Sequence, residues 1–82
     1  MESDRETYLR RFSINLRALR KAKGYTQERL AHEADVSYKH LQDLEAGKKC
    51  PSLIIVIRLC EALDVSLDEL LEGMIKMEKD SE

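Results

Sequence analysis

The chain has 82 residues, of which 43% are hydrophobic and 37% are charged, a balance that excludes a disordered chain. A length of this order allows one domain with a modest core, and no apolar run approaches the roughly 20 residues of a membrane span. The acidic start from Met1 to Glu6 lacks the basic and apolar regions of a signal peptide, so we expect a cytoplasmic protein. We expect one domain over residues 1–82, with a frayed start and an ordered helical core over about residues 7–75.

The formal net charge of −2 hides an uneven distribution along the chain. Residues 1–60 contain 12 Lys and Arg against 8 Asp and Glu, whereas residues 61–82 contain 2 against 8. Phosphate binding depends on local cations rather than on the total charge. A chain with a basic N-terminal part and an acidic C-terminal part is therefore compatible with binding to nucleic acid.

The first predicted helix carries apolar residues at helical spacing and ends at Gly24. Two short helices follow, over residues 25–47, and the buried face of the first is expected to be Leu30, Ala31 and Ala34. Thr26 is the expected N-cap of the first and Ser37 that of the second, because a side-chain oxygen at this position accepts an unpaired backbone N–H. The turn between them contains Asp35, and Gly47 stops the second helix.

The second of these short helices has two faces. Leu41 and Leu44 form its apolar stripe, while a step of about 100° per residue turns the side chains of Lys39, Gln42, Asp43 and Ala46 away from that stripe. Tyr38 and His40 flank this exposed face. Such a face is either an ordinary solvated surface or a reader of base edges, since a major groove admits one helix.

Several dispersed motifs lie in order between about Phe12 and Leu71: Asn15 to Arg20, Gly24 to Ala31, Val36-Ser37, Leu41, Leu44 to Gly47 and Pro51 to Leu53. In this order they resemble the phage repressor/Cro type of helix-turn-helix, also called the xenobiotic-response-element type. The resemblance implies a compact all-α domain of five helices, with the helix-turn-helix at helices two and three. It implies that Gln27 binds phosphate, that Arg20 and Glu45 form an ion pair beside the DNA backbone, and that four residues face the bases: Tyr38, Lys39, Gln42 and Asp43.

Further phosphate contacts are expected around this recognition helix, from Ser37, His40, Lys48 and Lys49. Among the base-reading residues, Lys39 favours guanine acceptors, Gln42 favours adenine, and Asp43 accepts from a cytosine amino group. The operator sequence does not follow from these preferences, because it depends on the docking angle of the helix.

The last two predicted helices carry more apolar residues than a five-helix core of this size can bury. The fourth starts after its cap Ser52, and the fifth starts at the capping box Ser66 to Glu69 and continues to Met77. Exposed apolar surface usually marks an interface, so we expect a homodimer. The alternative is that the last helix folds back over helices one and four. The expected dimer residues are Ile54, Ile55, Leu67, Leu71 and Met74.

The leading hypothesis is a sequence-specific transcriptional regulator that binds a pseudo-palindromic operator in double-stranded DNA as a homodimer, through residues Ser37 to Ala46. The resemblance includes the controller proteins of restriction-modification systems and compact phage or plasmid repressors. Activation would require a surface for RNA polymerase, for which Glu28 and Glu33 are candidates. The alternative is an antitoxin or adaptor that acts by protein binding.

The sequence shows no nucleophile with a base and no metal-ligand spacing, so we expect no enzyme, no cofactor and no metal.

Overall fold

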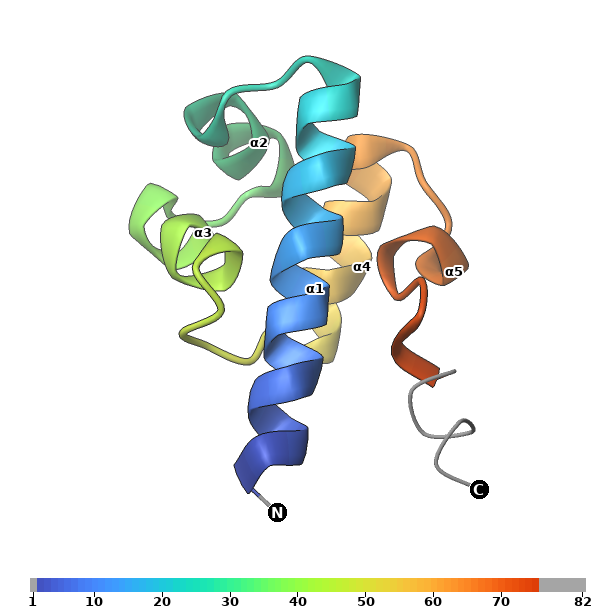
Figure 1. Ribbon diagram of the computed structural model, residues 1–82. Coiled ribbons are helices and arrows are strands. Elements are labelled where there is room, and N and C mark those ends of the chain that lie inside the picture. Colours follow the sequence, from blue (N-terminus) through green and yellow to red (C-terminus); the bar gives the residue numbers. More distant parts are fainter. Residues whose placement is uncertain (1, 76–82) are drawn as a thin grey trace.

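Five helices and no strand make up residues 2–75, the part of the protein that the computed structural model describes (Figure 1). They are α1 (Glu2–Lys23), α2 (Gln27–Ala34), α3 (Tyr38–Glu45), α4 (Leu53–Leu63) and α5 (Leu67–Leu70). The long α1 runs through the middle with α4 along it, while α2 and α3 lie on one side and α5 on the other (Figure 1). The predicted all-α fold with a helix-turn-helix at α2 and α3 is confirmed.

Each of the four later helices begins at a hydroxyl cap. The Oγ atom of the capping residue accepts the backbone N–H three residues later, over 3.0–3.1 Å, which satisfies one of the unpaired donors of the first turn. At α5 the carboxylate of Glu69 also accepts the Ser66 N–H over 2.9 Å, which completes the predicted capping box. The caps are Thr26, Ser37, Ser52 and Ser66.

The core is assembled from all five helices. Leu16, Leu30 and Leu41 are completely buried, and the predicted buried faces of α2 and α3 are confirmed. The small Ala31 and Ala34 of α2 are buried as well, and α2 packs against both α3 and α4. The remaining buried apolar residues are Phe12, Leu44, Leu59, Leu63 and Leu70.

Two predicted boundaries differ from the structure. The start of the chain is helical from Glu2 rather than frayed to Glu6, in agreement with the preference for acids such as Asp4 near a helix N-terminus. The fifth helix ends at Leu70, and Gly73 in the next turn has a φ of 84°, which interrupts the predicted helical repeat. Met77, the last residue expected in that helix, lies outside the described residues.

A side chain of α1 holds the end of α5. The Nδ2 atom of Asn15 donates to the carbonyl oxygens of Leu70 and Glu72, each over 2.9 Å. Carbonyls in the last turn of a helix lack partners within the helix, and Asn15 supplies them. The short α5 is thus attached to α1 and folds over the chain's own core. This agrees in part with the alternative to the dimer, in which the last helix folds back over helices one and four.

Candidate nucleic-acid interface

The turn between α2 and α3 depends on a left-handed residue. Asp35 has φ 57° and ψ 48°, and the N–H of Val36 donates to the Ala31 carbonyl over 3.0 Å, which closes the end of α2. Ser37 is already extended and caps α3. Asp is one of the few L-residues that tolerate a left-handed conformation, so the turn stays tight without the usual glycine.

α3 presents a polar face on the side away from its buried leucines. Tyr38 is 45% exposed, Lys39 and Ala46 are exposed, and Gln42 is half-buried. Leu41 and Leu44 have no exposed surface. The side chains of Tyr38, Lys39 and Gln42 are therefore available to a ligand that covers this face.

Asp43 does not belong to that exposed face, and its predicted exposure was wrong. The residue is 7% exposed, and its Oδ1 atom accepts from Nζ of Lys39 over 3.3 Å. Helical spacing gives only the direction in which a side chain leaves the helix, and it does not show that the Asp43 carboxylate pairs with Lys39 or that the Lys48 N–H bonds to the Asp43 carbonyl over 2.9 Å. Within residues 2–75 the carboxylate of Asp43 thus faces a lysine of its own helix rather than open solvent.

One buried carboxylate joins α1, α2 and the end of α3. Glu45 is 3% exposed and accepts from Arg20 through two bonds, Nε to Oε2 over 2.7 Å and Nη2 to Oε1 over 3.0 Å. Arg20 also donates to the Tyr25 carbonyl over 2.9 Å. Such a two-point contact fixes a guanidinium in direction as well as distance.

Gln27 belongs to the same network through a contact with Glu45 that no local sequence pattern predicts. Its Nε2 atom donates to Oε1 of Glu45 over 3.0 Å, across 18 positions of sequence. Gln27 is the first residue of α2, where backbone N–H groups lack helical partners and favour an anion. Its amide is therefore held in place beside a helix terminus that suits a phosphate.

The other predicted phosphate residues surround α3. The Ser37 Oγ atom accepts the His40 N–H over 3.0 Å, so its hydroxyl hydrogen is still able to donate outward. Lys48 and Lys49 are exposed in the loop between α3 and α4, and neither forms an ion pair within the described chain. His40 is half-buried.

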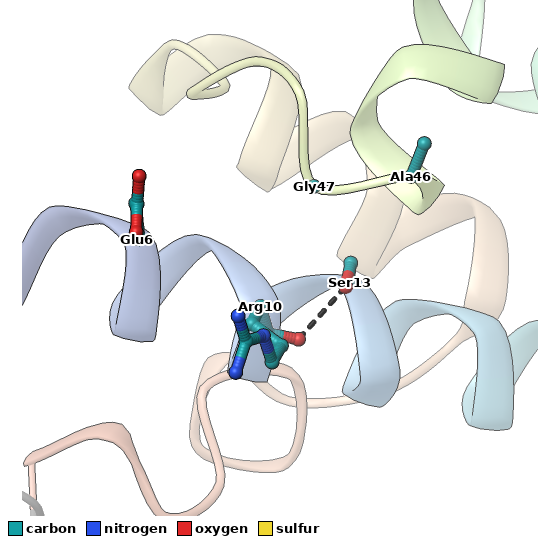
Figure 2. Close-up of a pocket in the computed structure, with 5 residues that line it drawn as sticks. All are labelled: Glu6, Arg10, Ser13, Ala46 and Gly47. Carbon is teal, nitrogen blue, oxygen red and sulfur yellow. Dashed lines mark hydrogen bonds between the residues drawn. The ribbon is translucent and has the colours of Figure 1, made fainter. Parts of the chain in front are cut away.

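A polar pocket borders the C-terminal end of α3 (Figure 2), and no sequence pattern predicted it. Glu6, Arg10 and Ser13 line it from α1, opposite Ala46 and Gly47. Gly47 has a φ of 73°, a backbone conformation that L side chains rarely adopt, so a glycine suits this position. The Ser13 hydroxyl donates to the Arg10 carbonyl over 2.7 Å. The loop that carries Lys48 and Lys49 leaves α3 beside this pocket.

The predicted dimer residues fall into two groups. Ile54 is 61% and Leu67 is 47% exposed, whereas Ile55, Leu71 and Met74 are partly buried against this chain's own core. Three further exposed apolar residues extend the first group: Leu53, Ile57 and Ile75. Among the described residues no group of His, Cys, Asp or Glu is arranged to hold a metal ion, and no helix there has the length and apolarity of a membrane span.

Comparisons with known proteins agree with this geometry. A family model described as helix-turn-helix matches residues 16–70. The HTH-type transcriptional regulator YazB of Bacillus subtilis is 42% identical over 55 residues, which cover 67% of this chain and 80% of that protein.

Two solved structures are also similar. The restriction-modification controller protein C.AhdI from Aeromonas hydrophila matches with a TM-score of 0.74 at 37% identity, over 76% of this chain and 94% of that one. The clp gene regulator ClgR from C. glutamicum matches with a TM-score of 0.78 at 30% identity, over 84% and 88% of the two chains. The chain therefore belongs to the helix-turn-helix family of DNA-binding transcriptional regulators and is not an enzyme.

Proposed function

We propose that the protein is a sequence-specific transcriptional regulator that reads double-stranded DNA with the segment Ser37 to Ala46. The observation that carries the proposal is the exposed polar face of α3, with Tyr38, Lys39 and Gln42, near the Gln27 terminus of α2 and the loop that bears the exposed Lys48 and Lys49. A helix in the major groove reads base edges, while the flanking groups contact phosphates.

The phosphate contacts would set the register of α3 on the duplex. Gln27 is held by Glu45, the last residue of α3, and Lys48 and Lys49 follow in the loop after it, so these proposed phosphate contacts gather at the C-terminal end of α3. Ser37 and His40 would add contacts near the start of α3. The Arg20–Glu45 pair would act indirectly, by fixing Gln27 and the end of α3 in one arrangement.

We further propose a homodimer. Ile54 and Leu67 are the most exposed of the five expected interface residues, and exposed apolar groups on neighbouring helices support an interface there. Ile55, Leu71 and Met74 would contribute the parts of their surface that the chain's own core leaves open. A twofold dimer places two recognition helices about 34 Å apart, one helical turn of DNA, and reads an inverted repeat.

The likeness to C.AhdI supports a controller of a restriction-modification system as the specific role, and the likeness to ClgR supports regulation of another gene set. Activation would need contact with RNA polymerase. Glu28 is exposed on α2, whereas the Glu33 carboxylate is engaged by Arg29 over 3.0 Å, so Glu28 is the better of the two candidate contacts.

Selection of bound duplexes from a random DNA pool, followed by the mass of the complex on the enriched duplex, tests the proposal. We expect an inverted repeat with half-sites one helical turn apart, bound by two chains or four. If folded protein enriches no sequence at low salt, the DNA-reading proposal is wrong and an antitoxin or adaptor role takes its place. Enrichment of a single half-site bound by one chain would contradict the homodimer alone.

A further inference from the structure

Asp43 is a buried acid on the helix proposed to read DNA, and unlike the buried Glu45 it is paired with a residue of its own helix. Its side chain is 10% exposed, while the side chain of its partner Lys39 is 78% exposed. A carboxylate on this helix repels the phosphates of a bound duplex. Its presence there requires a compensating cation, and Lys39 is the cation that contacts it.

The pair is not well explained as a device that stabilises the helix. In an α-helix an acid four residues before a lysine is the favourable order, and here the lysine comes first. The Lys39 side chain is mostly exposed, so solvent also screens the attraction between the two charges. The contact therefore has more effect on where the lysine points than on whether α3 forms.

We infer that Asp43 is a positioning residue for base recognition, whose carboxylate holds the Lys39 ammonium over the base edges. This inference rests on the proposed function. A lysine ammonium has three N–H donors, so the bond to Oδ1 of Asp43 leaves two for acceptors in the groove. Guanine offers two such acceptors, O6 and N7, on its major-groove edge. A tethered ammonium loses less side-chain freedom on binding than a free one.

Asp43 also connects the base-reading side chain to the phosphate loop. Its carbonyl oxygen accepts the Lys48 N–H over 2.9 Å, while its carboxylate accepts from Lys39. The positions of one proposed base contact and one proposed phosphate contact thus depend on the same residue. A shift of Asp43 would alter both.

The test compares the wild type with Asp43→Asn, Lys39→Ala and the double variant in the random-pool selection. Asparagine keeps the shape of the side chain and removes the charge. We expect Asp43→Asn and Lys39→Ala to lose preference at the same operator base pair, about tenfold, which lies within the range of one specific base contact. The double variant should lose no more at that base pair than Lys39→Ala does.

Affinity for a random-sequence duplex provides a second readout. If Asp43 only stabilised the fold, its replacement would not increase this affinity. Removing a negative charge beside the phosphates should make Asp43→Asn bind random DNA more tightly than the wild type. The double variant should likewise bind it more tightly than Lys39→Ala alone, which leaves the carboxylate without its cation. The matched control is Glu33→Gln, which removes the acid of the Arg29–Glu33 pair on α2, with the same spacing and order, and should leave the base preferences unchanged.

Loss of preference at a base pair that Lys39→Ala does not affect would overturn the inference and make Asp43 a base reader in its own right. Unchanged preferences in Asp43→Asn would overturn it as well. A wild-type protein that enriches no sequence would instead refute the proposed function, so the two failures are distinguishable.

Discussion

Single side chains in this protein determine the direction in which others point. Glu45 accepts from both Arg20 and Gln27 while only 3% exposed, so its charge is compensated by hydrogen bonds rather than by water. Lys48 has no such partner within residues 2–75 and remains a mobile point charge on a long stem. Polar residues held by other side chains and polar residues without such partners should therefore affect DNA binding in different ways when they are replaced.

Lys48→Ala should weaken binding to the operator and to random DNA by similar factors, because a phosphate contact carries no sequence information. The slope of the logarithm of the binding constant against the logarithm of the salt concentration should fall by about 1. Titrations of both duplexes at several salt concentrations measure this. Lys39→Ala is the comparison variant, and a loss confined to the operator in Lys48→Ala would contradict the phosphate assignment.

At the scale of the elements, the recognition unit is built from helices too short to form alone. α2 and α3 have eight residues each, below the length at which isolated helices are stable in water. Their caps, Thr26 and Ser37, and the left-handed Asp35 between them supply the missing terminal hydrogen bonds and the sharp change of direction. The turn is therefore a site where one backbone conformation affects the whole motif.

Asp35→Ala should lower the free energy of unfolding by about 1 kcal/mol, because alanine is strained in a left-handed conformation. Asp35→Gly should have a much smaller effect, since glycine adopts positive φ readily. Urea denaturation of both variants measures the difference. Asp64 has the same φ of 57° at the end of α4 and serves as an internal control. There too the alanine variant should have a lower free energy of unfolding than the glycine variant. Equal stability of the alanine and glycine variants would contradict the strain argument.

At the scale of the whole molecule, exposed charge and exposed apolar surface lie on different elements. The exposed lysines Lys39, Lys48 and Lys49 belong to α3 and the loop after it, while the exposed apolar residues Leu53, Ile54 and Ile57 lie on α4. A regulator that uses one surface for DNA and another for its partner needs this separation, because both must be occupied together.

Ile54→Glu should shift the protein toward the monomer, with a dimer dissociation constant at least about tenfold higher, because the interface would have to bury an unpaired charge. Analytical ultracentrifugation over a concentration series measures the shift, and affinity for an inverted repeat should fall with it. Ile14→Glu, at an isoleucine of α1 that is 41% exposed, is the matched control. An unchanged mass distribution for Ile54→Glu would exclude this part of α4 from the interface.

The sequence by itself determined the features that depend on neighbours a few residues apart. Caps such as Ser37 act three residues onward, and apolar spacing identifies the buried faces of α2 and α3, so both were predictable. The Arg20–Glu45 pair was expected only through the family resemblance, and the structure contains it.

Only the tertiary structure decided the contacts between residues far apart in the chain. The burial of Asp43, the bond from Gln27 to Glu45, and the bonds from Asn15 to the end of α5 depend on how the elements pack. Local patterns determine where helices begin and which faces are apolar, whereas the final placement of a polar side chain depends on which partner the packed core brings within reach.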